Sequence, residues 1–229
     1  MSREKQKILV IAPHPDDDLI GCGGSMAKHL TNGNTVYVIY VTYGNAENSE
    51  YPLEEFTEIR KAETLSAAKV IGLKEEDLFF LGEYPWKLNL ERVRFALLEL
   101  VRKIQPNLCC IPHLDDVHAD HRIVGQVALD AISMAPGKWF RPCGSSWNSF
   151  PAPTILAYEV WTPLSSPSYL EDITAFLEKK MEALREHKTQ AIDRYEAAYR
   201  GMNAYRGAMH GTGKYAEAFQ VIRIPRLPL

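Results

Sequence analysis

Residues 7–18 read KILVIAPHPDDD, a continuous apolar run that ends at Pro13 and is followed by one histidine and three aspartates. An apolar run without alternation is typical of a strand that is covered on both faces, as in a parallel sheet. Parallel α/β sheets bind their ligands beyond the carboxyl ends of the strands. The stretch therefore predicts both a parallel sheet and the place of a functional site.

Predicted strands and helices alternate along the rest of the chain. Further strands are predicted at residues 35–42, 78–81, 108–111, 155–161 and 219–224, and helices at residues 19–30, 52–71, 90–104, 123–134 and 173–199. Residues 135–153 and 200–216 show no period and are predicted to be irregular. The short spacing of strands and helices indicates an α/β fold with a doubly wound, mostly parallel, Rossmann-like sheet and helices on both faces. No linker is recognisable, so we expect residues 1–229 to form a single domain.

The composition of the chain excludes several classes of protein. The formal net charge of the 229 residues is −3, which argues against an electrostatic nucleic-acid binder. No apolar run approaches the roughly 18 residues that a membrane span needs, and the N-terminus lacks the layout of a signal peptide. We therefore expect a cytoplasmic protein with neither nucleic acid nor membrane as a partner.

The cysteines fit an intracellular protein without disulfides. They are Cys22, Cys109, Cys110 and Cys143, and no CxxC pair occurs. A chain of this size with so few cysteines is not a disulfide scaffold. Because Cys packs as a small apolar residue, we expect buried free thiols.

Two polar clusters follow two of the predicted strands. Residues 13–18 follow the first strand, and residues 112–121 follow the strand at 108–111. Together they hold four of the seven histidines and six aspartates. Imidazole and carboxylate groups suit a borderline metal such as zinc. Since both clusters should meet at one edge of the sheet, the sequence predicts a metal site there.

The spacing of the residues suggests how the ligands are divided. A catalytic zinc site keeps three protein ligands and one open position. Residues three apart across a turn can face one point, so His14 and Asp17 are candidate ligands, and His121 from the second cluster would be the third. One carboxylate must stay off the metal to take a proton from water, and Asp16 suits that role.

Simpler interpretations compete for single residues of the clusters. The aspartates at 16–18 could cap the following helix, and Asp18 could do only that. His113 could be a surface neighbour without a direct role. Three other histidines are expected at the surface, namely His29, His187 and His210.

Two other functional classes also compete with a metal-dependent enzyme. One is a nucleotide- or cofactor-binding module in which Gly21, Gly23 and Gly24 approach a phosphate. These glycines lack the GxGxxG order, and the three aspartates before them would repel a pyrophosphate. The other is a protein that binds a metal without catalysis.

Several stretches resemble one known family. Residues 13–24 (PHPDDDLIGCGG) resemble the first motif of the PIG-L/LmbE-like zinc-dependent N-acetylglucosaminyl N-deacetylases, and residues 118–122 (HADHR) resemble their second. Weaker similarities to the same family follow in order at residues 58–63, 71–73, 158–163, 180–190 and 215–219. The resemblance thus covers nearly the whole chain, apart from residues 135–153.

The resemblance implies a role for each matching residue. It implies Zn²⁺ as cofactor, held by His14, Asp17 and His121. Asp16 matches the general base, and His118 matches the residue that stabilises the oxyanion and protonates the leaving amine. Asp120 matches a carboxylate that orients a histidine, and Arg60 matches an arginine that contacts substrate.

The resemblance also implies a reaction and a class of substrate. It implies a hydrolase that removes the N-acetyl group from a GlcNAc-containing small-molecule conjugate or short oligosaccharide and releases acetate and a free amine. The partner would be a small amino-sugar substrate. Family members assemble as trimers or hexamers, although nothing in this sequence itself indicates a homo-oligomer. Among the tryptophans, Trp139 and Trp147 are the preferred candidates for stacking on a sugar ring.

Overall fold

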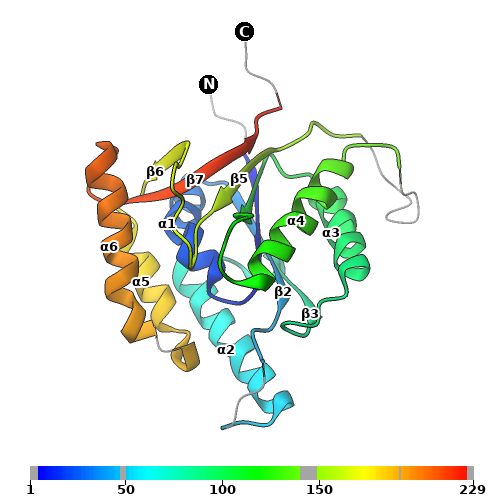
Figure 1. Cartoon of the computed structure of the whole chain (residues 1–229), viewed down its shortest axis with the longest axis horizontal. Helices are drawn as coiled ribbons and strands as arrows, with labels where there is room; N and C mark the ends of the chain where they lie inside the picture. Colours follow the sequence, from blue (N-terminus) through cyan, green and yellow to red (C-terminus); the bar gives the residue numbers. More distant parts are fainter. Residues whose placement is uncertain (1–4, 47–49, 140–148, 191, 226–229) are drawn as a thin grey trace.

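The structure is a computed structural model of the chain, and it describes residues 5–46, 50–139, 149–190 and 192–225 (Figure 1). The strands are β1 (Lys7–Ala12), β2 (Thr35–Thr42), β3 (Leu78–Glu83), β4 (Leu108–Pro112), β5 (Thr154–Tyr158), β6 (Tyr169–Asp172) and β7 (Ala216–Arg223). The α-helices are α1 (Asp17–Thr31), α2 (Leu53–Ile71), α3 (Leu90–Ile104), α4 (Ala119–Met134), α5 (Leu177–Arg185) and α6 (Ile192–His210). Single 3₁₀ turns lie at Glu75–Asp77 and Lys188–Gln190.

The described strands form one mostly parallel sheet. Its order is β3-β2-β1-β4-β5-β7-β6, with β1 to β5 parallel and β6 and β7 antiparallel to their neighbours. The strand order reverses between β1 and β4, which is the point where doubly wound sheets open a crevice for ligands. The predicted α/β fold is confirmed, and both polar clusters follow the two strands at this switch point.

Helices cover both faces of the sheet, as the fully apolar strands require. Ile8 and Val10 of β1 pack into the core under α1, α2 and α5, whereas Leu9 and Ile11 pack under α3 and α4. Figure 1 shows α3 and α4 in green on one side and α1, α2, α5 and α6 on the other. Successive side chains of a strand point to opposite faces, so an uninterrupted apolar run fills two cores.

The C-terminal third differs from the prediction. The single helix expected at residues 173–199 is wrong, because α5 begins only at Leu177 and a 3₁₀ turn separates α5 from α6. The irregular segment expected at 200–216 is also wrong, since α6 continues to His210. A Cβ on Gly207 would meet the carbonyl oxygen of Gly213 at 2.7 Å, so this glycine permits close packing and does not end the helix.

The helix expected at residues 123–134 begins four residues earlier, at Ala119. Asp120 and His121 therefore lie in its first turn and not in a loop, and the acidic side chain of Asp120 suits a helix N-terminus.

The described cysteines are free and buried, as predicted. They are Cys22, Cys109 and Cys110, and Cys143 lies outside the described residues. Among the described helices, none is long and apolar enough to cross a membrane.

Candidate metal centre and active site

Three donor atoms from the two polar clusters converge at the switch point of the sheet. Nδ1 of His14 lies 3.0 Å from Oδ2 of Asp17 and 3.3 Å from Nε2 of His121. The same Oδ2 lies 3.2 Å from Nε2 of His121. Three ligands of a tetrahedral zinc, each about 2.1 Å from the ion, would be about 3.4 Å apart. The triangle therefore has the size that a zinc ion needs.

The turn between β1 and α1 holds two of these donors in place. The backbone N–H of His14 donates to Oδ2 of Asp17 over 2.9 Å, and Nη2 of Arg60 donates to the carbonyl of Pro15 over 2.6 Å. Asp16 between them has φ 104°, a left-handed conformation that residues other than glycine rarely adopt. Strained backbone of this kind persists where surrounding contacts hold it, and it clusters at functional sites.

The electrostatics of the cluster favour positive charge. Burial alone would lower the pKa of His14, but hydrogen bonds with Asp120 and Asp17 raise it to about 8. Burial also opposes protonation of His121, yet Asp17 and Asp116 raise its pKa to about 10. Burial would raise the pKa of Asp17, but His121 holds it well below its usual range. A divalent cation would meet the same attraction as these protons.

A carboxylate lies behind each of the two histidines. Nε2 of His14 lies 3.2 Å from Oδ2 of Asp120. Nδ1 of His121 lies 3.4 Å from Oδ1 of Asp116. Metal-binding histidines commonly place the second ring nitrogen against a carboxylate, which fixes the tautomer and the orientation of the ring. Asp120, expected to orient a histidine, thus contacts His14, and Asp116 has the matching place behind His121.

Asp116 has no predicted role from the sequence, but in the structure its carboxylate contacts several neighbours. Its buried carboxylate accepts hydrogen bonds from the backbone N–H groups of His118, Trp161 and Thr162 over 2.8, 3.0 and 3.1 Å. His113 lies on the same carboxylate, with Nε2 3.5 Å from Oδ2. The available signal was its place in the second cluster, two residues before His118. Its partners at 161 and 162 are too distant in sequence to be anticipated.

Asp16 stands beside the donor triangle with its carboxylate outside the set of candidate ligands. Its side chain makes no capping hydrogen bond to α1, so the capping interpretation is wrong for this residue. Burial raises the pKa of Asp16 to about 7, although Arg60, with Nη2 3.6 Å from Oδ2, opposes the shift. Asp18 lies inside α1, where it accepts a hydrogen bond from the hydroxyl of Tyr40 over 3.0 Å. A carboxyl group that titrates near neutral pH suits proton transfer.

His118 lies between the metal candidates and the cavity. Its ring centroid is 4.6 Å from that of His121 and 4.6 Å from that of Trp86. Burial and the nearby charge of His14 lower the pKa of His118. The surroundings therefore favour a neutral ring, and the role of His118 in stabilising an oxyanion stays a prediction.

Arg60 lies at the wall of the cavity but is almost wholly enclosed. It is 1 % exposed, its Nη2 is bonded to Pro15, and its Nη1 lies 3.5 Å from Oε2 of Glu63. Glu63 in turn accepts hydrogen bonds from the backbone N–H and the hydroxyl of Thr189. The established contacts of Arg60 therefore hold the Pro15–Asp16 turn. A contact with substrate stays a prediction.

A cavity of about 210 Å³ opens directly above these groups. Its lining comprises His14, Asp16, Asp17, Ile20, Gly44, Ala46, Arg60, Pro85, Trp86, His118, Trp161, Gln190, Tyr195 and Tyr199. The preference for Trp139 as a sugar-stacking residue is wrong, because Trp86 and Trp161 line the cavity and Trp139 is not among its described lining residues. Trp147 lies outside the described residues.

Two further features of the described residues lie near or beyond this site. His14, His118 and Asp120 form a second group that could hold a cation, but it shares His14 with the triangle. A larger cavity of about 380 Å³, lined by residues such as Cys22, Met26 and Phe219, shares no residue with the site.

Comparison with known proteins identifies the family. The family described as PIG-L, GlcNAc-PI de-N-acetylase, matches residues 9–132, which span β1 to α4 and both polar clusters. The chain belongs to the PIG-L family. The matched residues include the donor triangle, Asp16 and the two supporting carboxylates. The family resemblance inferred from the sequence is thereby confirmed.

This PIG-L family chain is similar both to deacetylases and to a hydratase. It is 27 % identical to diacetylchitobiose deacetylase of Thermococcus kodakarensis, over 95 % of this chain and 83 % of the relative. It is 26 % identical to 4-oxalmesaconate hydratase of Pseudomonas putida, over 99 % and 93 %. The structure of N,N′-diacetylchitobiose deacetylase from Pyrococcus horikoshii superposes with a TM-score of 0.86 at 27 % identity, covering 97 % of this chain and 85 % of that one.

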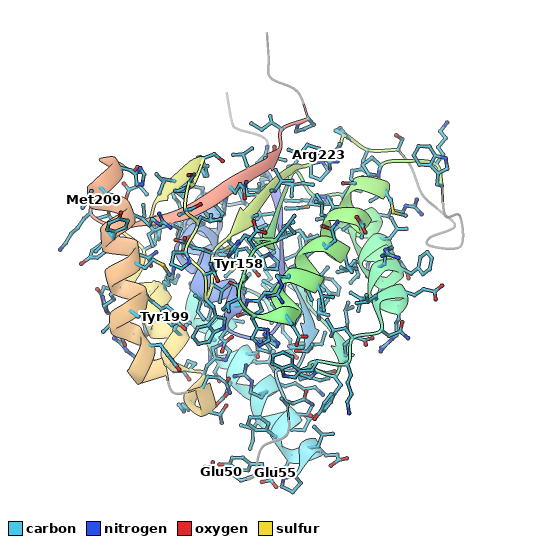
Figure 2. The ribbon with its side chains drawn as sticks, in the orientation of Figure 1. Glu50, Glu55, Tyr158, Tyr199, Met209 and Arg223 are labelled. Carbon is cyan, nitrogen blue, oxygen red and sulfur yellow. The ribbon has the colours of Figure 1, made fainter. Side chains whose placement is uncertain are left out.

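The glycines of the PIG-L first motif serve packing within the fold. A Cβ on Gly21 would meet the ring of Tyr158 at 2.2 Å, and one on Gly24 would meet Ile173 at 2.6 Å. Figure 2 places Tyr158 in the centre of the molecule, where it is fully buried. These glycines face the core and not a ligand, which removes the main support for a nucleotide-binding module.

One histidine expected at the surface, and one for which a surface position was an alternative, are buried. His113 is 3 % exposed and His187 is 1 % exposed, so the surface interpretation is wrong for both. His210 is exposed, as expected. His113 packs against Asp116 behind the metal candidates, whereas Nδ1 of His187 has no hydrogen-bond partner among the described residues.

Proposed function

We propose that this chain is a zinc-dependent N-deacetylase that hydrolyses the N-acetyl group of a GlcNAc-containing small molecule. The observation that carries the proposal is the triangle of His14, Asp17 and His121 donors, 3.0–3.3 Å apart, with Asp16 beside it. Membership of the PIG-L family and similarity to a diacetylchitobiose deacetylase support it.

The donor set fits zinc better than a hard cation. Two imidazoles and one carboxylate suit Zn²⁺, whereas Mg²⁺ and Ca²⁺ prefer oxygen ligands alone. Three protein ligands leave an open position, as in catalytic zinc sites. When bound, the ion would polarise the acetamide carbonyl and lower the pKa of water.

The chain's own residues would supply the proton transfers. Asp16 takes a proton from the water that attacks the acetamide carbon, and later passes that proton to the nitrogen as the carbon–nitrogen bond breaks. Neutral His118 donates its ring N–H to the carbonyl oxygen as charge develops there, an effect worth roughly 10²–10³ in rate for comparable donors. The products are acetate and a free amine.

The hydratase among the relatives makes hydration of an unsaturated acid a second candidate. A polyanionic substrate needs cationic partners in the cavity. Among the described lining residues, Arg60 is the one permanently cationic side chain, and its Nη2 is bonded to Pro15. Asp16 lines the same cavity, together with several aromatic side chains. This lining favours an uncharged acetamido sugar over a polyanion.

One assay separates the candidates. The zinc-loaded protein is incubated with N-acetylglucosamine, N,N′-diacetylchitobiose and 4-oxalmesaconate, and free primary amine, acetate and loss of the unsaturated acid are measured. We expect amine and acetate in equal amounts, lost with a chelator and restored by zinc. Consumption of the unsaturated acid alone would favour the hydratase. No reaction with one zinc per chain would favour a metal-binding protein without catalysis.

Some expectations from the sequence stay predictions. We propose that residues 1–229 form one deacetylase domain, which the single sheet of the described residues supports. The cytoplasmic location and a trimeric or hexameric assembly also stay predictions.

A further inference from the structure

Two exposed tryptophans flank the cavity above the donor triangle. Trp86, in the segment between β3 and α3, is 62 % exposed, and Trp161, after β5, is 45 % exposed. Both line the cavity. Exposed aromatic side chains that gather around a cavity are typical of a binding surface.

Trp86 is tied to the metal candidates through its backbone. Its N–H donates to Oδ2 of Asp120 over 3.1 Å, and the same oxygen lies 3.2 Å from Nε2 of His14. Trp86 has φ 66°, so the chain accepts a left-handed conformation here to make these contacts. Its ring packs on His118 with centroids 4.6 Å apart. The indole is therefore held in a fixed position beside the reacting groups.

Trp161 is tied to the other histidine in the same way. Its N–H donates to Oδ2 of Asp116 over 3.0 Å, and Oδ1 of Asp116 lies 3.4 Å from Nδ1 of His121. The Trp161 ring meets Tyr195 edge to face, with centroids 5.4 Å apart. Each carboxylate behind a metal candidate thus also anchors one indole at the mouth of the cavity.

We propose that Trp86 and Trp161 are the specificity-determining residues of the site, and that they select a substrate in which the acetamido sugar is linked to a second, uncharged sugar ring. This inference rests on the proposed deacetylase function and narrows its substrate class. The C–H faces of a pyranose ring are apolar and flat enough to stack on an indole. Among the described lining residues, no side chain offers a free cation for a carboxylate at the mouth.

The test compares a neutral and an anionic substrate that share the same acetamido sugar. These are N,N′-diacetylchitobiose and N-acetylglucosaminyl malate, assayed by amine release with Trp161→Ala, Trp161→Phe and Trp86→Asn. Asn keeps the N–H and tolerates the left-handed backbone. Trp139→Ala is the matched control, because Trp139 is 69 % exposed and lies outside the cavity lining. Zinc content is measured for every variant.

For the wild type, we expect kcat/KM for the disaccharide to exceed that for the malate conjugate by about ten-fold or more. Trp161→Ala and Trp86→Asn should lose about ten-fold on the disaccharide, chiefly through KM, and little on the malate conjugate. Trp161→Phe should restore part of the loss, and Trp139→Ala should change neither value. An unchanged ratio in zinc-loaded Trp161→Ala, or a wild type that prefers the malate conjugate, would overturn the proposal.

A binding measurement separates this inference from the proposed function. Cellobiose, an uncharged disaccharide that lacks the amide and so is not hydrolysed, is titrated into zinc-loaded protein while the heat of binding is recorded. A saturable heat of binding in the wild type and in Trp139→Ala that is absent from the Trp86→Asn/Trp161→Ala double variant supports the indole site, even if no amide is hydrolysed. The same heat in the double variant, or none in the wild type, contradicts it even if deacetylation is observed.

Discussion

Oδ1 of Asp116 lies 3.4 Å from Nδ1 of His121, on the opposite edge of the ring from Nε2, which lies 3.2 Å from Asp17. Both residues are buried, and Asp116 also accepts three backbone N–H groups. Although burial opposes it, contacts with His113 and His121 hold the pKa of Asp116 well below its usual range. An ionised Asp116 fixes the tautomer that leaves Nε2 free for a metal.

Asp116→Asn should weaken zinc binding by about 10–100-fold, because the amide keeps an acceptor for the backbone but loses the charge behind His121. Competition with a chromophoric chelator measures the affinity. Asp115→Asn is the control, since Asp115 is adjacent in sequence and exposed. Equal zinc affinity of Asp116→Asn and Asp115→Asn would remove the supporting role.

Asp16→Asn should keep one zinc per chain and lower kcat roughly 10²–10⁴-fold, because an amide cannot take the proton of the attacking water. Steady-state amine release and elemental analysis of the same sample check both halves. Asp18→Asn should be far milder, since Asp18 lies inside α1 against Tyr40. Near wild-type turnover in Asp16→Asn would show that another group is the base.

Lys180→Met should lower the free energy of unfolding by about 3–5 kcal/mol, because it leaves Glu217 as a buried charge without its cation. Nζ of Lys180 is fully buried and lies 2.8 Å from Oε1 of Glu217. It also donates to the carbonyl of Ile20, while Gly24, four residues on in α1, donates its N–H to Glu217. The pair therefore braces the helix that carries Asp17.

Urea unfolding measures this loss, and Lys74→Met is the matched control. Lys74 and Glu76 form an exposed pair, 3.4 Å apart, and such pairs contribute at most about 1 kcal/mol. A Lys180→Met protein as stable as Lys74→Met would contradict the bracing role.

The protein should become less stable as the pH decreases, because His187 binds a proton less readily in the folded chain. Burial and, to a smaller extent, the charge of Arg60 lower the pKa of His187 to about 3, against about 6.5 in an unfolded chain. Between these values the unfolded chain binds the proton and the folded chain does not. His187 therefore lowers the free energy of unfolding by about 1.4 kcal/mol for each pH unit below 6.5.

Urea unfolding between pH 4.5 and 7.5, a range about the pKa of the unfolded chain and above that of the folded one, tests the effect. His187→Gln should flatten the slope by about one proton, while the exposed His210→Gln should keep the wild-type slope. An unchanged slope in His187→Gln would mean that His187 has the same pKa in the folded and unfolded chains, which contradicts the prediction.

The sequence alone predicts correctly those parts of the fold and the site that depend on one short segment. The apolar run of β1 is covered on both faces, and the spacing of His14 and Asp17 across one turn suffices to bring both to one point. The second cluster follows β4, the neighbour of β1, so His121 could be assigned because parallel strands end at the same edge.

The wrong predictions concern features that depend on contacts between segments that are distant in the sequence. Strand β6 exists because Tyr169–Asp172 pairs with β7, which no local pattern of residues 169–172 reveals. Trp161 lines the cavity because its N–H is bonded to Asp116, 45 residues earlier. The preference for Trp139 rested on its place in an irregular segment, which says nothing about the direction of a side chain.

The most direct test of the metal centre is a crystal structure of the zinc-loaded protein with anomalous data collected on both sides of the zinc absorption edge. We expect one peak about 2.1 Å from Nδ1 of His14, Oδ2 of Asp17 and Nε2 of His121. A peak on the second group, of His14, His118 and Asp120, or none at one zinc per chain, would contradict this ligand set.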